Sequence, residues 1–158
     1  MIRAATADDI DAIAALHREA RATYYRDRLP EDAYAGPEET ARSRAAWAAA
    51  VAQGRVLCAE RDGVLAGVAS SGVRDGVMYL GQLHVAPAQW RRGVGGELHR
   101  ACVDAWRAQG VTAVRLDVYE HNTRAQAFYA AHGWQPDPDV PRSSTHLVLR
   151  LTLEPSAE

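Results

Sequence analysis

The sequence predicts a mixed α/β (α+β) fold, in which about four helices accompany one mixed sheet of about six or seven strands. Three strand-like runs between residues 55 and 85, separated by glycine turns, predict an antiparallel meander. A helical stripe then separates the run at 79–85 from a run at 113–119, which predicts a parallel pair with a right-handed crossover. At 158 residues, we expect a single domain spanning 1–158.

Composition excludes several classes of partner. The apolar fraction is 47% and the charged fraction 24%, which is ordinary for a globular protein. A net charge of −2 gives no global basic field, so we expect no nucleic-acid partner. No apolar run approaches the length of a membrane span, and the N-terminus lacks a basic-then-apolar signal. These features predict a soluble, cytoplasmic protein with no membrane partner.

Reactive side chains are limited in kind. All 18 basic residues are arginines, so lysine Schiff bases and PLP chemistry are excluded. Cys58 and Cys102 each lie in an apolar run without a Cys-x-x-Cys pattern, which indicates buried, inert thiols. The six histidines show no spacing typical of zinc ligands, so we expect no metal site.

The first half of the chain reads as a strand and two helices. Residues 2–5 are a short strand, and Thr6 with Asp9 is a variant of the capping box. A helical stripe follows, and Pro37 begins a second helix that ends at Gly54. Residues 22–36 between the two helices show no clear period. The stripe consists of Ile10, Ile13, Leu16 and Ala20.

From Arg55 the pattern changes to strands. Asp62-Gly63 predicts a type I′ turn between runs 55–60 and 64–72, and a second turn at 74–76 leads to the run 77–85. Later, Asn122 or Thr123 caps a short helix that Gly133 closes. Further strands are expected from Trp134 and over residues 146–153.

The stretch from Tyr79 to Trp106 predicts a strand, a glycine turn and a helix. Pro87 ends the strand, and an apolar stripe of Val94, Leu98, Ala101 and Ala105 marks the helix. The first N–H groups of a helix lack partners within it, and glycines let an anion approach them. Arginines at the same turn favour a phosphate or pyrophosphate. The turn contains Arg91, Arg92, Gly93, Gly95 and Gly96.

Two familiar phosphate-binding patterns do not fit this turn. A Walker loop requires a lysine, and the chain has none. A dinucleotide fingerprint requires a third glycine at position 98, where the chain has Leu98. The phosphate ligand must therefore belong to another class.

Two segments, VAPAQWRRGVGGEL and NTRAQAFYAAHGW, resemble the GCN5-related N-acetyltransferase (GNAT) superfamily. That family carries Gln/Arg-x-x-Gly-x-Gly/Ala after a strand; Gly93 and Gly95 match it, and Trp90 departs from it. The second pattern, Asn-x-x-Ala-x-x-Phe-Tyr-x-x-x-Gly-aromatic, is matched in full. Its members here are Asn122, Ala125, Phe128, Tyr129, Gly133 and Trp134. The likeness covers nearly the whole chain.

The resemblance implies the GNAT fold, with strands 79–85 and 113–119 splayed apart, and acetyl-CoA (coenzyme A) as cofactor. Pantetheine would pair with the backbone of residues 83–85, and the pyrophosphate would bind N–H groups of residues 91–96. Asn122 and the helix after it would flank the thioester. The cofactor-binding residues so implied are Leu83, His84, Val85, Arg91, Arg92, Gly93, Val94, Gly95, Gly96, Asn122, Ala125, Phe128 and Tyr129.

The resemblance further implies an N-acetyltransferase that transfers acetyl directly to a primary amine. Tyr129 would be the catalytic acid that protonates the leaving thiolate, and a backbone N–H near Val85 would stabilise the oxyanion. The base stays open. Tyr79 occupies the family's position and is a poor base at neutral pH, while Glu120, His84 and a water chain are alternatives. An acyl-enzyme is not expected, because neither cysteine has an activating partner.

The acceptor is expected to be a small-molecule or peptide amine. Tyr24, Tyr25 and Tyr79 are candidate substrate contacts, since the resemblance builds the acceptor pocket from their segments. Asp137 and Asp139 could favour a cationic acceptor. A non-catalytic acetyl-CoA-binding regulatory module is an alternative, as is a protein N-terminal or lysine acetyltransferase. Similar proteins commonly form dimers, so a homodimer is considered as well.

Overall fold

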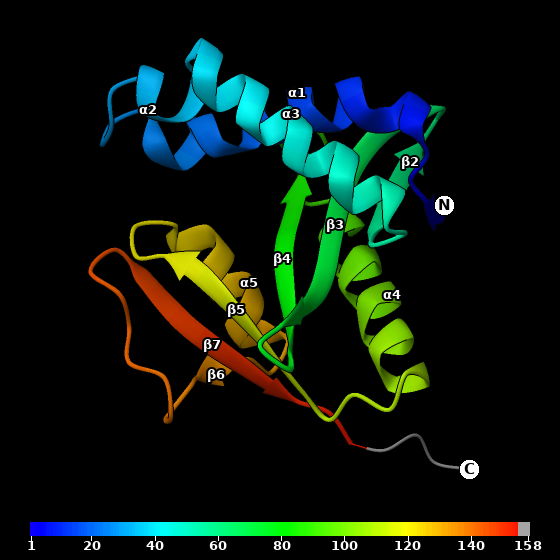
Figure 1. Cartoon of the computed structure of the whole chain (residues 1–158), viewed down its shortest axis with the longest axis vertical. Coiled ribbons are helices and arrows are strands. Elements are labelled where there is room, and N and C mark those ends of the chain that lie inside the picture. The colour runs from blue at the N-terminus through cyan, green and yellow to red at the C-terminus, as the bar shows by residue number, and fades with distance from the viewer. Residues whose placement is uncertain (155–158) are drawn as a thin grey trace. The chain divides into compact units, whose positions relative to one another are not determined.

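The computed structural model describes residues 1–154 and contains one seven-stranded sheet in the order β1-β2-β3-β4-β5-β7-β6 (Figure 1). The strands are β1 (Ile2–Ala4), β2 (Val56–Arg61), β3 (Val64–Arg74), β4 (Val77–Val85), β5 (Ala113–Tyr119), β6 (Gln135–Pro136) and β7 (His146–Thr152). The predicted mixed sheet of six or seven strands is confirmed.

Four α-helices have nine residues or more, as predicted, and they are α1 (Ile10–Tyr25), α3 (Pro37–Ala52), α4 (Val94–Ala108) and α5 (Thr123–Ala131). A single helical turn, α2 (Asp32–Ala35), lies between α1 and α3. Short 3₁₀ helices, η1 (Ala7–Asp9) and η2 (Pro87–Gln89), precede α1 and follow β4.

The chain divides into two compact units. Unit 1 contains residues 1–70 and 82–101, and unit 2 contains residues 71–81 and 102–158, of which 155–158 lie outside the described part. Strands β3 and β4 and helix α4 each contribute residues to both units. Each unit is described by itself below.

In unit 1, β2 and β3 form the first, antiparallel hairpin of the predicted meander, with Cys58 opposite Val68, and β1 adds antiparallel to β2, with Ile2 opposite Ala59. Asp62 and Gly63 have φ angles of 55° and 75°, as the type I′ turn requires. Helices α1 and α3 run side by side (Figure 1). Their apolar faces form a core with the strands; its buried members are Ile13, Leu16, Trp47, Ala50, Val56, Cys58 and Val68.

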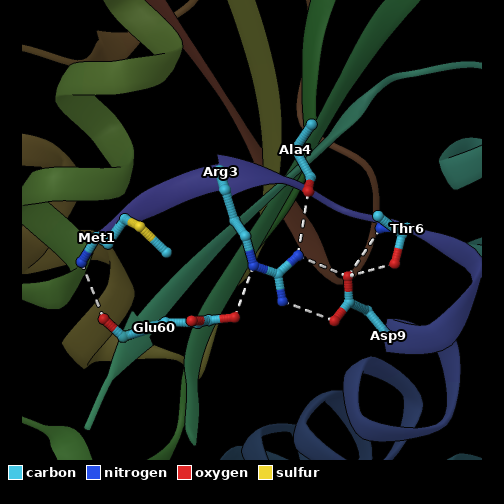
Figure 2. Close-up of polar contacts among 6 residues, drawn as sticks. All are labelled: Met1, Arg3, Ala4, Thr6, Asp9 and Glu60. Atoms are coloured by element: carbon cyan, nitrogen blue, oxygen red, sulfur yellow. Dashed lines mark hydrogen bonds and ion pairs between the residues drawn. The ribbon is translucent and has the colours of Figure 1, made fainter. Parts of the chain in front are cut away.

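A charged network fixes the N-terminal strand of unit 1 (Figure 2). The Arg3 guanidinium donates two bonds of 2.7 Å to the Asp9 carboxylate and a third, of 2.6 Å, to Glu60. Asp9 also accepts the Thr6 N–H at 2.7 Å, so the predicted capping box is confirmed, although it begins η1 rather than α1 itself. Its hydrogen bonds with Arg3 hold the pKa of Asp9 well below the ordinary value of an aspartate.

The segment 22–36 is more regular than predicted. Helix α1 continues through Tyr25, and α2 then forms within the segment. The helical stripe fades there because Tyr24 and Tyr25 are both half-buried, so the alternation of apolar and polar faces is lost.

In unit 2, β4 pairs in parallel with β5 at Met78–Val114 and Tyr79–Arg115, as predicted. Strand β7 pairs antiparallel with β5 along its length, and β6 adds two residues on its far side. Figure 1 shows α5 behind β5 and β7. Strand β6, which corresponds to the strand predicted from Trp134, is only two residues long. The predicted splay of β4 from β5 stays a prediction.

The buried stripe of α4 differs from the predicted one. Val94 and Leu98 are buried as expected, but Cys102 and Trp106 follow them into the core, while Ala105 is exposed. Residues spaced by four share a helix face, and the bulky Trp106 decides which face packs inward.

Candidate active site

The predicted phosphate turn has a strained, exposed backbone in unit 1. Arg91 and Gly93 have φ angles of 67° and 79°, and both are exposed together with Arg92. A non-glycine residue with positive φ is uncommon, and such strain concentrates at functional sites. Successive N–H groups in this conformation form a concave anion-binding arrangement.

The first turn of α4 supplies further donors to the same place. The Glu97 N–H bonds to the Gly93 carbonyl at 3.1 Å, which is the first bond of the helical ladder. The N–H groups of Val94, Gly95 and Gly96 therefore precede the ladder, where a helix offers them no partner. Two of these three residues have no side chain to obstruct an approaching anion. The turn fits a phosphate or pyrophosphate group.

The phosphate turn is tied to the end of β4. The Trp90 indole N–H donates to the Val85 carbonyl at 3.1 Å. Trp90 is the position that departs from the family pattern, and its side chain here closes the loop from strand to helix. The stretch 83–85 lies in the same unit as residues 91–96, and the Trp90 bond ties Val85 to the residue that immediately precedes the turn.

Sequence reasoning missed Gly67, which lets α4 approach the sheet. A Cβ at Gly67 would lie 2.8 Å from Leu98 Cδ1, 2.9 Å from Val94 Cγ1 and 3.1 Å from the His84 carbonyl oxygen. Any larger residue would push the N-terminus of α4 away from β3. A glycine inside a strand pattern is the signal that indicates such a close approach.

Another pair missed by sequence reasoning lies at the start of α4. Glu97 in its first turn forms an ion pair with Arg61, at the end of β2. A carboxylate beside an anion site would repel a phosphate, and Arg61 offsets that charge. Their separation of 36 positions in the sequence left no local signal.

The candidate acceptor residues Tyr24 and Tyr25 contact each other at the end of α1. Their ring centroids are 4.5 Å apart, and Tyr34 lies 5.8 Å from Tyr25. Arg21 lies over the Tyr25 ring at 5.4 Å and pairs with Glu39 at 3.0 Å. Burial raises the pKa of Tyr24 above its ordinary value, so this phenol stays protonated. The cluster offers aromatic surface rather than a free charge.

Tyr79, the third candidate acceptor contact, lies in unit 2 between two arginines. It stands opposite Arg115 in the sheet, and Arg74 lies 4.6 Å over its ring. Arg115 in turn donates to Asp137 at 2.7 Å.

The loop acids Asp137 and Asp139 each form an ion pair with an arginine of the sheet. Burial alone would raise the pKa of Asp137, but the Asp139 N–H and Arg115 outweigh it, and the net pKa is lowered. Arg150 stands opposite Arg115 and pairs with Asp139 at 3.7 Å. The two acids thus offset like charges that face each other across β5 and β7. The suggestion that they favour a cationic acceptor is not supported by these contacts.

The second motif is assembled on α5 in unit 2. The Asn122 side chain accepts the Ala125 N–H at 3.2 Å, so Asn122, not Thr123, is the cap. Tyr129 is buried at 7% exposure, with its ring centroid 5.4 Å from Phe128 and 5.7 Å from Trp134. Its orientation is therefore fixed by aromatic neighbours.

The side chains considered as bases are also engaged. In unit 2, Glu120 forms an ion pair with Arg142, and His121 Nε2 lies 3.4 Å from the Glu120 carboxylate. In unit 1, burial lowers the pKa of His84 well below the ordinary histidine value, with smaller contributions from nearby His17 and Arg21. A histidine that resists protonation is a weak base.

Both cysteine thiols are shielded from solvent. Cys58 and Cys102 are buried and free, and burial raises the pKa of their thiols to about 11 and about 12. The predicted burial of both thiols is confirmed. Within residues 1–154 no group of three or more His, Cys, Asp or Glu side chains is arranged to hold a metal ion. Over the same residues, no helix combines the length and apolar character that crossing a membrane requires.

The mixed sheet and the strand–turn–helix are those of a protein that binds a phosphate-bearing cofactor. Comparison with known families gives the particular class. The profile of the Acetyltransferase (GNAT) family matches residues 13–134, and the chain belongs to this family. It is an acetyltransferase by family, and members of the family use acetyl-CoA. No curated protein sequence matches the chain.

Solved structures share this fold over nearly the whole chain. The PaiA N-acetyltransferase of Thermoplasma acidophilum, solved with coenzyme A, has a TM-score of 0.85 at 17% identity, covering 97% of this chain and 98% of that one. The ribosomal-protein-S18-alanine N-acetyltransferase of Escherichia coli has a TM-score of 0.73 at 19% identity, covering 100% and 96%.

A third structure, yncA of Salmonella typhimurium, a putative acetyltransferase solved with acetyl-CoA, has a TM-score of 0.69 at 23% identity, covering 100% of this chain and 96% of that one. At these identities the likenesses show the fold alone, and they carry no acceptor over to this chain.

Proposed function

We propose that the chain is an acetyl-CoA-dependent N-acetyltransferase that acetylates a primary amine of a small molecule or peptide. The observation that supports this most is the strained turn at residues 91–96, whose backbone donors fit a pyrophosphate. The family membership and the N-acetyltransferases among the similar structures support the amine as acceptor.

Residues of unit 1 would bind the cofactor. The N–H groups of residues 91–96 would hold the pyrophosphate, and the backbone of residues 83–85 would pair with the pantetheine arm. When bound, acetyl-CoA supplies the acetyl group as a thioester. An N–H near Val85 is the proposed donor to the carbonyl oxygen that develops negative charge.

Tyr129 is the proposed catalytic acid, and Asn122, Ala125 and Phe128 of the same segment are proposed cofactor contacts. The buried, aromatic surroundings of Tyr129 keep its ring in one orientation, which general acid catalysis requires. Its hydroxyl would protonate the leaving thiolate.

We propose that water takes the proton of the acceptor amine. Arg142 pairs with the Glu120 carboxylate, and burial makes the His84 imidazole resist protonation, so we assign the proton to water rather than to either side chain. Tyr24, Tyr25 and Tyr79 are the proposed acceptor contacts. A cytoplasmic location and a homodimer stay predictions from the sequence and the resemblance.

The test is a screen of amines with acetyl-CoA that measures free thiol release, with an amine-free blank. Small alkyl amines and peptides with a free α-amine form the two arms. Products should resist hydroxylamine, which cleaves esters and thioesters but not amides. Tight acetyl-CoA binding without thiol release in either arm would contradict the enzyme and favour the non-catalytic binding module.

A further inference from the structure

A buried pair of histidines joins α1 to β4 within unit 1. His17 is 7% exposed, and its ring centroid lies 4.6 Å from that of His84, with the planes tilted by 36°. His84 is the central residue of the stretch 83–85. The chemistry proposed above uses the backbone of that stretch and leaves both imidazoles without a role.

The proton of His17 is fixed on one nitrogen. The Trp47 indole N–H donates to His17 Nδ1 at 3.0 Å, and an indole nitrogen can only donate. Nδ1 must therefore be the acceptor, and the proton of the neutral ring lies on Nε2. The Ser43 hydroxyl reaches the same Nδ1 at 3.1 Å. Two residues of α3 thus select one tautomer of a residue on α1.

The proton of His84 is fixed as well. Its Nε2 lies 2.5 Å from Gln82 Oε1, and an amide oxygen can only accept. Nε2 therefore carries the proton. Gln82 and His84 are two positions apart on β4, so both side chains lie on the same face of the strand.

Electrostatics keep both rings neutral. Burial, with a smaller effect of the nearby Arg21 that Glu39 opposes, lowers the pKa of His17 to about 4. A proton on either ring would place a charge against the other ring and near Arg21. The contact is a neutral stack that survives across the physiological pH range.

The backbone around His84 is also held by β3. The Ala86 N–H bonds to the Ala66 carbonyl at 2.9 Å, and the His84 carbonyl lies close to Gly67. The His17 side chain of α1, which α3 holds in turn, contacts this end of β4. Strand β3 holds the same end through its backbone.

We propose that the His17–His84 pair, locked by Trp47, Ser43 and Gln82, positions the backbone of residues 83–85 for acetyl-CoA. The two histidines are positioning residues and not the catalytic base. This inference rests on the proposed function, because it assigns the pantetheine contact to residues 83–85.

The first test exchanges His17 for two residues of different hydrogen-bonding capacity. His17→Asn places Oδ1 where Nδ1 accepts, whereas His17→Leu leaves the Trp47 N–H without its acceptor. We expect His17→Leu to raise the KM for acetyl-CoA about tenfold, since displaced binding groups lose affinity, and His17→Asn, which keeps an acceptor for Trp47 but loses the ring that stacks on His84, to recover only part of it. If His17→Leu does not fold, Gln82→Leu removes the partner of His84 and is judged by the same tenfold criterion.

The second test separates positioning from base catalysis. His84→Gln keeps a donor toward Gln82 but cannot accept a proton from an amine and cannot stack. We expect the KM for acetyl-CoA to rise and kcat to fall by less than tenfold. A fall in kcat of about 10²-fold or more at unchanged KM is the signature of a lost general base and would overturn the inference.

Ile13→Val is the matched control, since Ile13 is fully buried on α1 in the same core. It should lower thermal stability without moving the KM for acetyl-CoA. Equal KM shifts in Ile13→Val and His17→Leu would reduce the effect to general destabilisation and refute positioning. An unchanged KM in His17→Leu would refute it too. Failure of the wild-type protein to bind acetyl-CoA in calorimetry would instead refute the proposed function on which the inference rests.

Discussion

The turn at residues 91–96 in unit 1 and the segment 122–134 in unit 2 are the two motifs of the family, and they are built differently. The turn presents backbone N–H groups and depends on glycines, that is, on side chains being absent. The segment depends on particular side chains, because Asn122 caps the helix and Tyr129 is fixed among aromatic rings.

This difference explains where each motif tolerates change. Backbone donors survive a change of neighbouring side chain, so Trp90 can replace the family's Gln or Arg and bond the Val85 carbonyl instead. The backbone cannot replace the Tyr129 hydroxyl or the Asn122 side-chain oxygen if either is removed. We therefore expect the turn to fail when a side chain is added and the segment to fail when one is removed.

The largest expected effect follows removal of one oxygen from the segment. Tyr129→Phe should lower kcat by roughly 10²–10⁴-fold, the usual range for a general acid, with little change in the KM for acetyl-CoA. Steady-state thiol release with an amine from the screen measures both. Wild-type kcat in the variant would remove Tyr129 from the chemistry and leave water as the acid.

A second variant destabilises unit 1 at a residue outside both motifs. Asp9→Asn removes the charge that Arg3 pairs with, and should lower the free energy of unfolding at pH 7 by about 2 kcal/mol. Because Arg3 lowers the pKa of Asp9 in the folded protein, this stability is present above the unfolded value of about 3.9 and is lost as the pH falls through the folded value.

Urea denaturation at pH 7 and pH 3 measures the effect of Asp9→Asn. The matched control is Asp11→Asn, whose partner Arg44 lies 2.6 Å away in an exposed pair; it should cost less than about 1 kcal/mol. Affinity for acetyl-CoA should be unchanged in both variants. A loss of cofactor affinity in Asp9→Asn would show that the turn responds to stability in general, and the contrast between the motifs would weaken.

The smallest expected effect is on the helix cap of the segment. Asn122→Ala should lower the free energy of unfolding by about 1 kcal/mol, because the Ala125 N–H loses its acceptor. Thr123→Ala, at the exposed neighbouring position, is the control and should stay within about 0.5 kcal/mol of wild type. A larger cost at Thr123 than at Asn122 would contradict the assigned cap.

Features set by neighbouring residues were predictable from the sequence. The turn at Asp62-Gly63 requires positive φ at two successive positions, and the residue types alone indicate it. The donors at the start of α4 are equally local, and so is the cap of α5, which the sequence narrowed to Asn122 or Thr123 and the structure assigns to Asn122. The parallel pairing of β4 with β5 follows from the helix between them.

Contacts between distant residues were not predictable. The stack of His17 on His84, the pairing of Arg115 with Asp137 and the fit of Gly67 against α4 each depend on elements that meet only after folding. Even the face that α4 buries depended on whether Trp106 or Ala105 packs inward.

The central claim is that backbone donors at residues 91–96 bind acetyl-CoA, and calorimetric titration of wild type and Gly95→Glu tests it most directly. A carboxylate at this position would face the phosphates, and like charges brought together cost several kcal/mol, so affinity should fall by at least about 100-fold. Ala105→Glu adds the same charge at an exposed site on the same helix and should bind as wild type does. Equal acetyl-CoA affinity in Gly95→Glu and wild type would contradict the account.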